Sequence, residues 1–147
     1  MKELDILKVL KTKSKCKRRQ VGCIITKEGF ILGTGYNKPF IGLHKCCRRC
    51  HSKSGEDIAN CNALHAEQMA IIEAGKKGCF GATMYVSTFP CEICAKMIIF
   101  AGIAKIKYIE TYPTMLDQVK LFTEYGIELE QIDENDVKSE ENVEYSE

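Results

Sequence analysis

The sequence predicts an α/β fold built on a five-stranded mixed sheet. A segment with helical periodicity comes first, two β-rich runs around a tight turn follow, and strand-like runs then alternate with helix-like runs. Strands joined by a short turn pair antiparallel, whereas strands joined through a helix pair parallel, so one sheet should contain both pairings. The chain has 147 residues, of which 45% are hydrophobic. That length is sufficient for one domain with its own core.

The first half of the chain should contain one helix and one hairpin. Apolar residues at helical spacing predict a helix over residues 4–13. Two β-rich runs, residues 21–26 and 30–35, flank the turn residues Lys27-Glu28-Gly29 and predict an antiparallel pair. Residues 36–62 are dense in glycine, cysteine and basic residues and predict a long loop, which usually has a function.

The second half should alternate helices and strands. Helices are predicted over residues 64–75, 90–100 and 114–125, and strands over residues 82–88, 103–111 and 127–132. Glycines at 75, 78, 102 and 126 mark the expected helix ends. The domain is therefore expected to span residues 1–132.

Composition narrows the class of protein. Nine cysteines in 147 residues are fewer than in secreted disulfide scaffolds. Residues 1–5 show no apolar signal core, and no apolar run approaches a membrane span, so a cytoplasmic protein is expected. In a reducing compartment, a set of cysteines more often binds metal than forms disulfides. Residues 133–147 carry seven acidic residues against one lysine and predict a flexible acidic tail.

Two short motifs carry the chemistry. His65-Ala66-Glu67 and Pro90-Cys91-x-x-Cys94 together match the H-x-E…P-C-x-x-C pattern of zinc enzymes that deaminate nucleobases. One imidazole and two thiolates leave the fourth position of a tetrahedral zinc open to water, as in catalytic sites. Pro90 should place both cysteines in the first turn of a helix, which favours thiolate. Glu67 is predicted to shuttle the proton of that water to the substrate. The alternative is a structural zinc site in which Glu67 is incidental.

Around these motifs, the chain resembles the deoxycytidylate (dCMP) deaminases of the cytidine/deoxycytidylate deaminase superfamily. The resemblance covers residues 16–132, in the segments Cys16-x-Arg18-Arg19-Gln20-Val21-Gly22, Gly35-Tyr36-Asn37, Ser54-Gly55-Glu56, Leu64-His65-Ala66-Glu67-Gln68, Gly81-Ala82-Thr83-Met84-Tyr85-Val86, Pro90-Cys91-x-x-Cys94-Ala95-Lys96 and Ala101-Gly102-Ile103. It implies a three-layer α/β/α cytidine-deaminase-like fold. It also implies a hydrolase that converts dCMP to dUMP and ammonia, supplying dUMP for thymidylate synthesis.

The resemblance also suggests residues that bind the nucleotide. Asn37 would contact the sugar or the base, and the backbone of Ala66 would read the cytosine edge. Arg18 is predicted to bind the 5′-phosphate, because arginine can hold a phosphate through two parallel hydrogen bonds. The alternative for Arg18 is a solvated surface residue. Tyr112 suits packing as well as it suits substrate contact.

The remaining cysteines suggest a second metal site. Members of the family with a second zinc use cysteines matching Cys16 and Cys46, and related bacterial sequences also carry cysteines at the two other positions. The implied structural zinc ligands are Cys16, Cys46, Cys50 and Cys61. The register stays open, because Cys47-x-x-Cys50 has a common ligand spacing and His51 could replace a thiolate. Free thiols are the alternative. Cys23 is expected to be a buried packing residue and Cys79 a loop residue.

Two positions depart from the family pattern. Met69 stands where the family has Asn in H-A-E-x-N-A, as it does in tRNA adenosine deaminases, and Lys38 stands where the family has Gly after G-Y-N. Members are often regulated by deoxynucleoside triphosphates (dCTP or dTTP, with Mg²⁺) near this loop, and they form homo-oligomers such as hexamers. Lys38 therefore bears on regulation and on substrate choice, and Met69 also bears on substrate choice.

Two other functions stay open. Met69 and the basic residues 1–19, with eight Lys/Arg against two acids, favour a deaminase of cytosine or adenine in RNA or DNA. The lack of an aromatic-rich basic stretch argues against such a nucleic-acid partner. A catalytically silent zinc-binding module is the third possibility, and the intact Glu67 argues against it.

Overall fold

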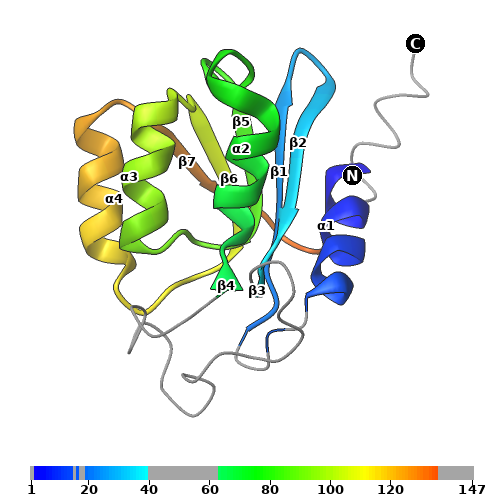
Figure 1. Ribbon diagram of the computed structural model, residues 1–147. Helices are drawn as coiled ribbons and strands as arrows, with labels where there is room; N and C mark the ends of the chain where they lie inside the picture. The colour runs from blue at the N-terminus through cyan, green and yellow to red at the C-terminus, as the bar shows by residue number, and fades with distance from the viewer. Residues whose placement is uncertain (1, 15, 17–18, 40–62, 136–147) are drawn as a thin grey trace.

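The predicted helices and strands are all present in the computed structural model, which describes residues 2–14, 16, 19–39 and 63–135 (Figure 1). In chain order they are α1 (Lys2–Lys13), β1 (Gly22–Lys27), β2 (Phe30–Tyr36), β3 (Lys38–Pro39), β4 (Ala63–Leu64), α2 (Ala66–Cys79), β5 (Thr83–Thr88), α3 (Glu92–Ala101), β6 (Lys105–Glu110), α4 (Met115–Glu124) and β7 (Glu128–Gln131). No helix among these residues has the length and apolar character needed to cross a bilayer.

Five strands form the predicted mixed sheet, in the order β2-β1-β5-β6-β7. β1 pairs antiparallel with both β2 and β5, whereas β5, β6 and β7 run parallel. The β1–β2 turn places Glu28 at φ 53° and Gly29 at φ 84°. Two successive left-handed residues give a turn whose twist matches that of the flanking strands. The short strands β3 and β4, which the sequence did not predict, pair with each other at the two ends of the predicted loop.

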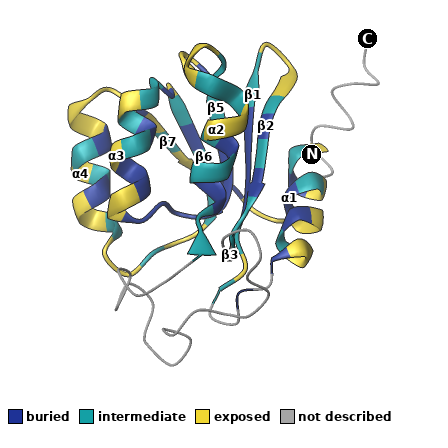
Figure 2. Cartoon of the chain, viewed as in Figure 1, coloured by how far each residue is buried: buried dark blue, intermediate teal, exposed yellow. Residues whose placement is uncertain are grey.

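Helices cover both faces of the sheet, which confirms the three-layer arrangement (Figures 1 and 2). Cys23 and Ile25 of β1 belong to the apolar cluster formed with α2, α3 and α4. Ile24, between them, packs with the leucines of α1 in a second cluster. This alternation follows from the two-residue period of a strand, which sends neighbouring side chains to opposite faces.

Helix α2 lies unusually close to β2. A Cβ atom added at Gly33 would meet the carbonyl oxygen of Ala70 at 2.2 Å, and one added at Gly35 would meet that of Ala66 at 2.1 Å. Only glycine leaves room for this approach. The two glycines therefore fix the distance of the first turns of α2 from the sheet.

Gly75 interrupts α2 as predicted, and the expectation about Cys79 is wrong. Gly75 is non-helical, at φ 74° and ψ 169°, and a further helical turn follows it to Cys79. Glycine tolerates this conformation, so the apolar face can resume after the kink. Cys79 is therefore a fully buried helical residue and not a loop residue, while Cys23 is buried as predicted.

Candidate metal centre

The site residues gather at the carboxyl edge of the parallel strands. α3 follows β5 directly, so Cys91 lies just beyond the end of β5. The last turn of α2 leads into the start of β5, so the first turn of α2 lies at the other end of the sheet, near the carboxyl end of β5 (Figure 1). The carboxyl edge of parallel strands is the usual place for sites in α/β proteins.

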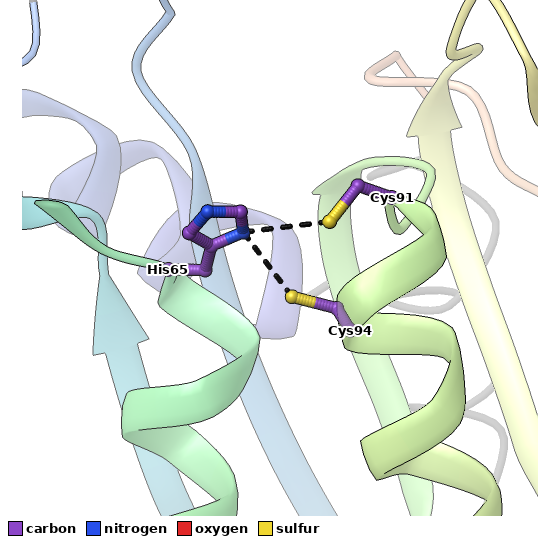
Figure 3. A group of neighbouring side chains, drawn as sticks. All are labelled: His65, Cys91 and Cys94. Atoms are coloured by element: carbon purple, nitrogen blue, oxygen red, sulfur yellow. Dashed lines mark hydrogen bonds between the residues drawn. The ribbon is translucent and has the colours of Figure 1, made fainter. Parts of the chain in front are cut away.

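Three side chains at this edge form a compact group of metal donors (Figure 3). His65 Nδ1 lies 3.5 Å from Cys91 Sγ and 3.3 Å from Cys94 Sγ. The candidate donor atoms of all three residues lie within 4.8 Å of one another. Tetrahedral zinc with bonds of about 2.0–2.3 Å needs donors roughly 3.5 Å apart. The donor chemistry and the spacing both fit zinc.

Each donor stands at the start of a helix. His65 is the N-cap of α2, and Cys91 is the N-cap of α3, with Cys94 in its first turn. The backbone N–H of His65 donates to Gln68 Oε1 at 2.9 Å, which fixes the first turn of α2. The free N–H groups and the positive end of each helix dipole favour thiolate at this place.

The turn that carries Cys91 is held from α4, by residues that the sequence analysis did not single out. The buried ring of Phe89 stacks edge-on against Tyr108 at 4.8 Å and against Phe122 at 5.9 Å. Gln118 Nε2 donates to the carbonyl oxygen of Pro90 at 3.3 Å. Gln118 is 2% exposed. The sequence offered one signal for this contact, because Gln118 is a polar residue on the apolar face of the predicted helix 114–125.

The two thiols differ in their affinity for a proton. The pKa of Cys91 is lowered to about 4, chiefly by a hydrogen bond from the Cys94 thiol and further by His65. The pKa of Cys94 is raised well above its ordinary value, because the thiol is hydrogen-bonded to Cys91, buried and close to Glu67. Without metal, the pair therefore holds one thiolate and one thiol. A bound divalent cation would favour thiolate at both positions.

Glu67 is a buried carboxyl beside these donors. It lies in the first turn of α2 and is 5% exposed. Burial raises its pKa to about 7, and the negative charge of Cys91 adds to this effect. A carboxyl that titrates near neutral pH can both accept and deliver a proton.

The residues predicted to bind nucleotide lie at the same edge where the structure describes them. Ala66 is fully buried between His65 and Glu67. The ring of Tyr112, two residues beyond β6, lies beneath the guanidinium of Arg19 at 5.6 Å from its centroid.

Asn37 follows the end of β2 and uses its side-chain amide in three hydrogen bonds. Its Oδ1 accepts from Ser14 Oγ at 2.7 Å and from the Val21 N–H at 2.9 Å. Its Nδ2 donates to the carbonyl oxygen of Arg19 at 2.6 Å. Asn37 therefore ties the segment between α1 and β1 to the end of β2, whatever contact it makes with a nucleotide.

Most of the second metal site falls outside the described residues. Cys16 is buried, and its N–H donates to Ser14 Oγ at 3.2 Å. The other candidate ligands and the predicted phosphate ligand lie outside the described part of the chain: Cys46, Cys47, Cys50, His51, Cys61 and Arg18. The four-cysteine zinc site and the role of Arg18 stay predictions.

Known proteins resemble this chain in sequence and in fold. The chain is 34% identical over 125 residues to the deoxycytidylate deaminase of Saccharomyces cerevisiae, covering 82% of this chain and 40% of that protein. It is 31% identical over 147 residues to that of Enterobacteria phage T4, covering 74% of this chain and 76% of the relative. The crystal structure of dCMP deaminase from cyanophage S-TIM5 in complex with dCMP and dUMP matches with a TM-score of 0.74 and 30% identity, over 89% of this chain and 94% of that one.

The chain also matches a family model, over a part that the relatives share. The chain spans about two fifths of the length of its two yeast relatives, 40% and 42%. The part shared with the family nevertheless contains the whole candidate metal centre. Residues 3–110 match the family described as the cytidine and deoxycytidylate deaminase zinc-binding region, and the chain belongs to this family.

Proposed function

We propose that the protein hydrolyses the 4-amino group of dCMP, giving dUMP and ammonia. The observation that carries this proposal is the buried carboxyl of Glu67, whose pKa is raised to about 7 beside a His/Cys/Cys donor group. A structural metal site has no use for a neutral-range proton carrier at its side. The similarity to a dCMP deaminase crystallised with dCMP and dUMP supports the choice of substrate.

The chain's own residues divide the work as follows. His65, Cys91 and Cys94 would hold zinc, which when bound lowers the pKa of a coordinated water. Glu67 would accept the proton of the attacking water, deliver it to the ring nitrogen of cytosine and assist departure of the amine. One water is consumed for each ammonia released. The Ala66 backbone and Asn37 would orient the cytosine and the sugar, with Arg18 on the phosphate.

An ammonia-release assay across five substrates tests the function. The zinc-loaded protein would be given dCMP, CMP, deoxycytidine, cytosine and a tRNA anticodon stem-loop. We expect turnover of dCMP at the highest kcat/KM. Turnover of the stem-loop alone would refute the proposal and favour the nucleic-acid deaminase that Met69 suggests. Turnover of none would favour a silent zinc-binding module.

A single substitution tests the role of Glu67. Glu67→Gln keeps the size of the side chain and one acceptor oxygen, but the amide cannot take up and return a proton. We expect full zinc content and loss of deamination by about 10²- to 10⁴-fold. Metal analysis separates this result from loss of the ion, and Glu92→Gln, at an exposed neighbour of the metal-binding cysteines, is the matched control. Substantial turnover by Glu67→Gln would contradict the assignment.

We further propose a structural zinc held by Cys16, Cys46, Cys50 and Cys61, with Cys47 or His51 as rival ligands. The burial of Cys16 supports its inclusion. Metal analysis of the purified protein should give two zinc ions per chain. One zinc, with these thiols open to alkylation, would refute the second site.

Regulation and assembly are proposed on the family resemblance. dCTP or dTTP, with Mg²⁺, would change the rate, and the chain would form a homo-oligomer such as a hexamer. The ammonium of Lys38 lies 5.7 Å from the ring centroid of Tyr36, next to Asn37, which places a cation where the family has glycine. Rate measurements with each triphosphate and light scattering test these points. Rates that neither nucleotide changes would refute the regulation, and a monomer would refute the assembly.

A further inference from the structure

The peptide group between Pro90 and Cys91 sets the direction of one metal donor. On its first side, the proline ring fixes φ of Pro90, and the N–H of Phe89 donates to the Glu110 carbonyl oxygen at 2.8 Å. On its second side, the carbonyl oxygen of Cys91 accepts from the Ala95 N–H at 2.9 Å, in the first turn of α3. Rotation of the peptide plane between these anchors would swing Cys91 Sγ relative to the other two metal donors.

Gln118 of α4 holds this peptide plane from the side of the core. Its Nε2 donates to the Pro90 carbonyl oxygen at 3.3 Å, and both residues are no more than 2% exposed. Water therefore has no access to replace the donor. A buried carbonyl oxygen without a partner is costly, and proteins normally satisfy it. The amide of Gln118 thus opposes any rotation that turns the Pro90 carbonyl away from α4.

The same amide nitrogen reaches a second turn at this edge of the sheet. It carries two N–H groups, and it also donates to Thr114 Oγ1 at 3.4 Å. Thr114 is the N-cap of α4, and its hydroxyl makes no capping bond to that helix. The Met115 N–H donates to the Tyr112 carbonyl oxygen at 3.0 Å, which continues the connection back towards β6. Gln118 therefore links the turn after β5, which carries Cys91, to the turn after β6.

Gln118 is a polar residue on a helix face that is otherwise apolar. Met115, Val119 and Phe122, its neighbours on α4, pack in the apolar core. Apolar contacts have no preferred direction, so they tolerate a small rotation of a turn that packs against them. A hydrogen bond weakens when its donor and acceptor are misaligned. The amide therefore adds a directional restraint on the Pro90 carbonyl that packing alone does not supply.

We propose that Gln118 is a positioning residue for the metal centre, because it holds the Pro90 carbonyl and thereby fixes the direction of Cys91 Sγ. The inference deepens the proposed function and rests on it for one of its readouts, the rate of dCMP deamination. Hydrogen-bonding groups behind a metal ligand orient that ligand, and their loss lowers metal affinity or activity by about 10- to 100-fold. The effect of Gln118 is therefore expected on the metal site itself, beyond any effect on the stability of the fold.

Gln118→Met tests the proposal, because methionine keeps the length of the side chain and has no N–H to donate. Zinc affinity, measured by competition with a chelator, should fall by about 10- to 100-fold. The absorption bands of Co²⁺ bound in place of zinc depend on the angles between the ligands and should shift. With zinc at saturation, kcat for dCMP should fall by about tenfold or more, while KM changes by less than about threefold. Each value is compared with wild type, so the signal of a second metal site cancels.

Val119→Ala is the control for stability, because Val119 is the next residue of α4, packs in the same core and has a side chain that cannot form hydrogen bonds. It should destabilise the fold and leave zinc affinity, the Co²⁺ bands and kcat unchanged. Thr114→Val removes the second acceptor of the amide and should change the same three values as Gln118→Met, by a smaller factor. Equal losses of zinc affinity in Gln118→Met and Val119→Ala would overturn the proposal. So would unchanged zinc affinity and Co²⁺ bands in Gln118→Met, or in Thr114→Val if Gln118→Met does not fold.

The metal measurements also separate failure of this inference from failure of the proposed function. They use zinc or Co²⁺ and no nucleotide, so their outcome does not depend on the substrate. A wild type that does not deaminate dCMP, together with a Gln118→Met variant that binds zinc about tenfold more weakly, refutes the function and supports the inference. A wild type that deaminates dCMP, together with unchanged zinc affinity and Co²⁺ bands in Gln118→Met, refutes the inference alone.

Discussion

Gly35→Ala tests whether the close approach of α2 to β2 positions the catalytic residues. The new Cβ would lie 2.1 Å from the carbonyl oxygen of Ala66 and 3.0 Å from the N of Ala70. Atoms separated by less than 3.0 Å must move apart, so the first turn of α2 has to shift by about 1 Å. Both obstacles are backbone atoms, so no change of rotamer can relieve the overlap. Forced overpacking of this kind costs about 1–3 kcal/mol, and we expect the upper end.

The activity should fall further than the stability implies, because Ala66 stands between His65 and Glu67. A displacement of about 1 Å at a reacting group can cost on the order of 10²-fold in rate. Urea unfolding of the zinc-loaded protein measures the loss of stability. The loss of activity is measured as kcat for dCMP, at a temperature where the variant is folded.

Gly78→Ala, in the last turn of the same helix, is the matched control. Its Cβ meets other atoms no closer than 3.4 Å, which is ordinary contact. Alanine there should stabilise the helix by up to about 1 kcal/mol without changing kcat. If Gly35→Ala matched wild type in both stability and kcat, the close approach would not position the site.

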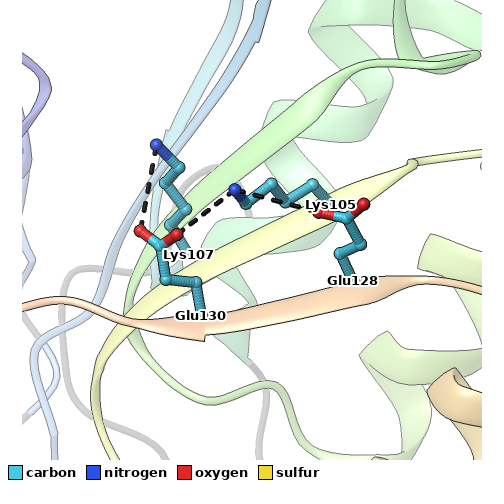
Figure 4. A network of polar contacts seen from close by, with 4 residues as sticks. All are labelled: Lys105, Lys107, Glu128 and Glu130. Carbon is cyan, nitrogen blue, oxygen red and sulfur yellow. Dashed lines mark ion pairs between the residues drawn. The ribbon is translucent and has the colours of Figure 1, made fainter.

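Three further predictions concern charge and hydrogen bonding. The pKa of Glu67 is about 7 in the folded protein against an ordinary 4.5, so the ionised carboxylate opposes folding. In metal-free protein, raising the pH from 5 to 8 should therefore destabilise wild type relative to Glu67→Gln by up to about 3 kcal/mol. Urea unfolding at the two pH values measures this difference. A difference that does not change with pH would contradict this. Asn37→Ala removes the acceptor of the Val21 N–H and the donor to the Arg19 carbonyl oxygen, while Ser14 Oγ can still donate to the Asn37 carbonyl oxygen at 2.8 Å. The substitution should lower the free energy of unfolding by about 2–3 kcal/mol. Gln20→Ala, which removes one bond of 3.4 Å, should cost less than about 0.5 kcal/mol. Equal losses would show that the Asn37 amide does not tie the two segments together. Glu130 pairs with Lys105 at 3.2 Å and with Lys107 at 4.0 Å (Figure 4), and its side chain is about half exposed. Glu130→Gln should therefore lower the free energy of unfolding by less than about 1 kcal/mol, and should not change it in about 0.5 M salt. A larger loss of stability that does not depend on salt would refute this prediction.

Local patterns were sufficient to predict the four helices and the five strands of the main sheet, because each of these has its own signal, whereas the short strands β3 and β4 have none. The continuous β-rich runs of β1 and β5 and the glycine after α3 predict structures that the tertiary contacts confirm. The helical turn after Gly75 was missed for a physical reason. Gly75 interrupts the helix as its sequence signal predicts, but Cys79 is buried in the core and keeps the next turn packed against the sheet.

The metal donors could be predicted from sequence because their spacing along the chain reflects coordination chemistry. The supports of the site could not. Gln118 and Phe89 hold the Cys91 turn through contacts between α4 and the end of β5, and only the packing of α4 on the sheet brings them together.

The electrostatics of the site explain why Glu67 is suited to move protons and not to bind the metal. In metal-free protein, the acidic groups of Glu67, Cys91 and Cys94 lie close together in a buried place. Near neutral pH Cys91 is ionised, Cys94 keeps its proton and Glu67 is partly protonated, which limits the repulsion between them. A cation held by His65, Cys91 and Cys94 needs both thiolates, so its binding must release the proton of Cys94. Glu67 is then the one acid of the group that is not consumed as a ligand. Its burial still opposes permanent ionisation, while the cation favours it. These opposing effects keep its two protonation states close in free energy, which is the condition for accepting a proton in one step and returning it in the next.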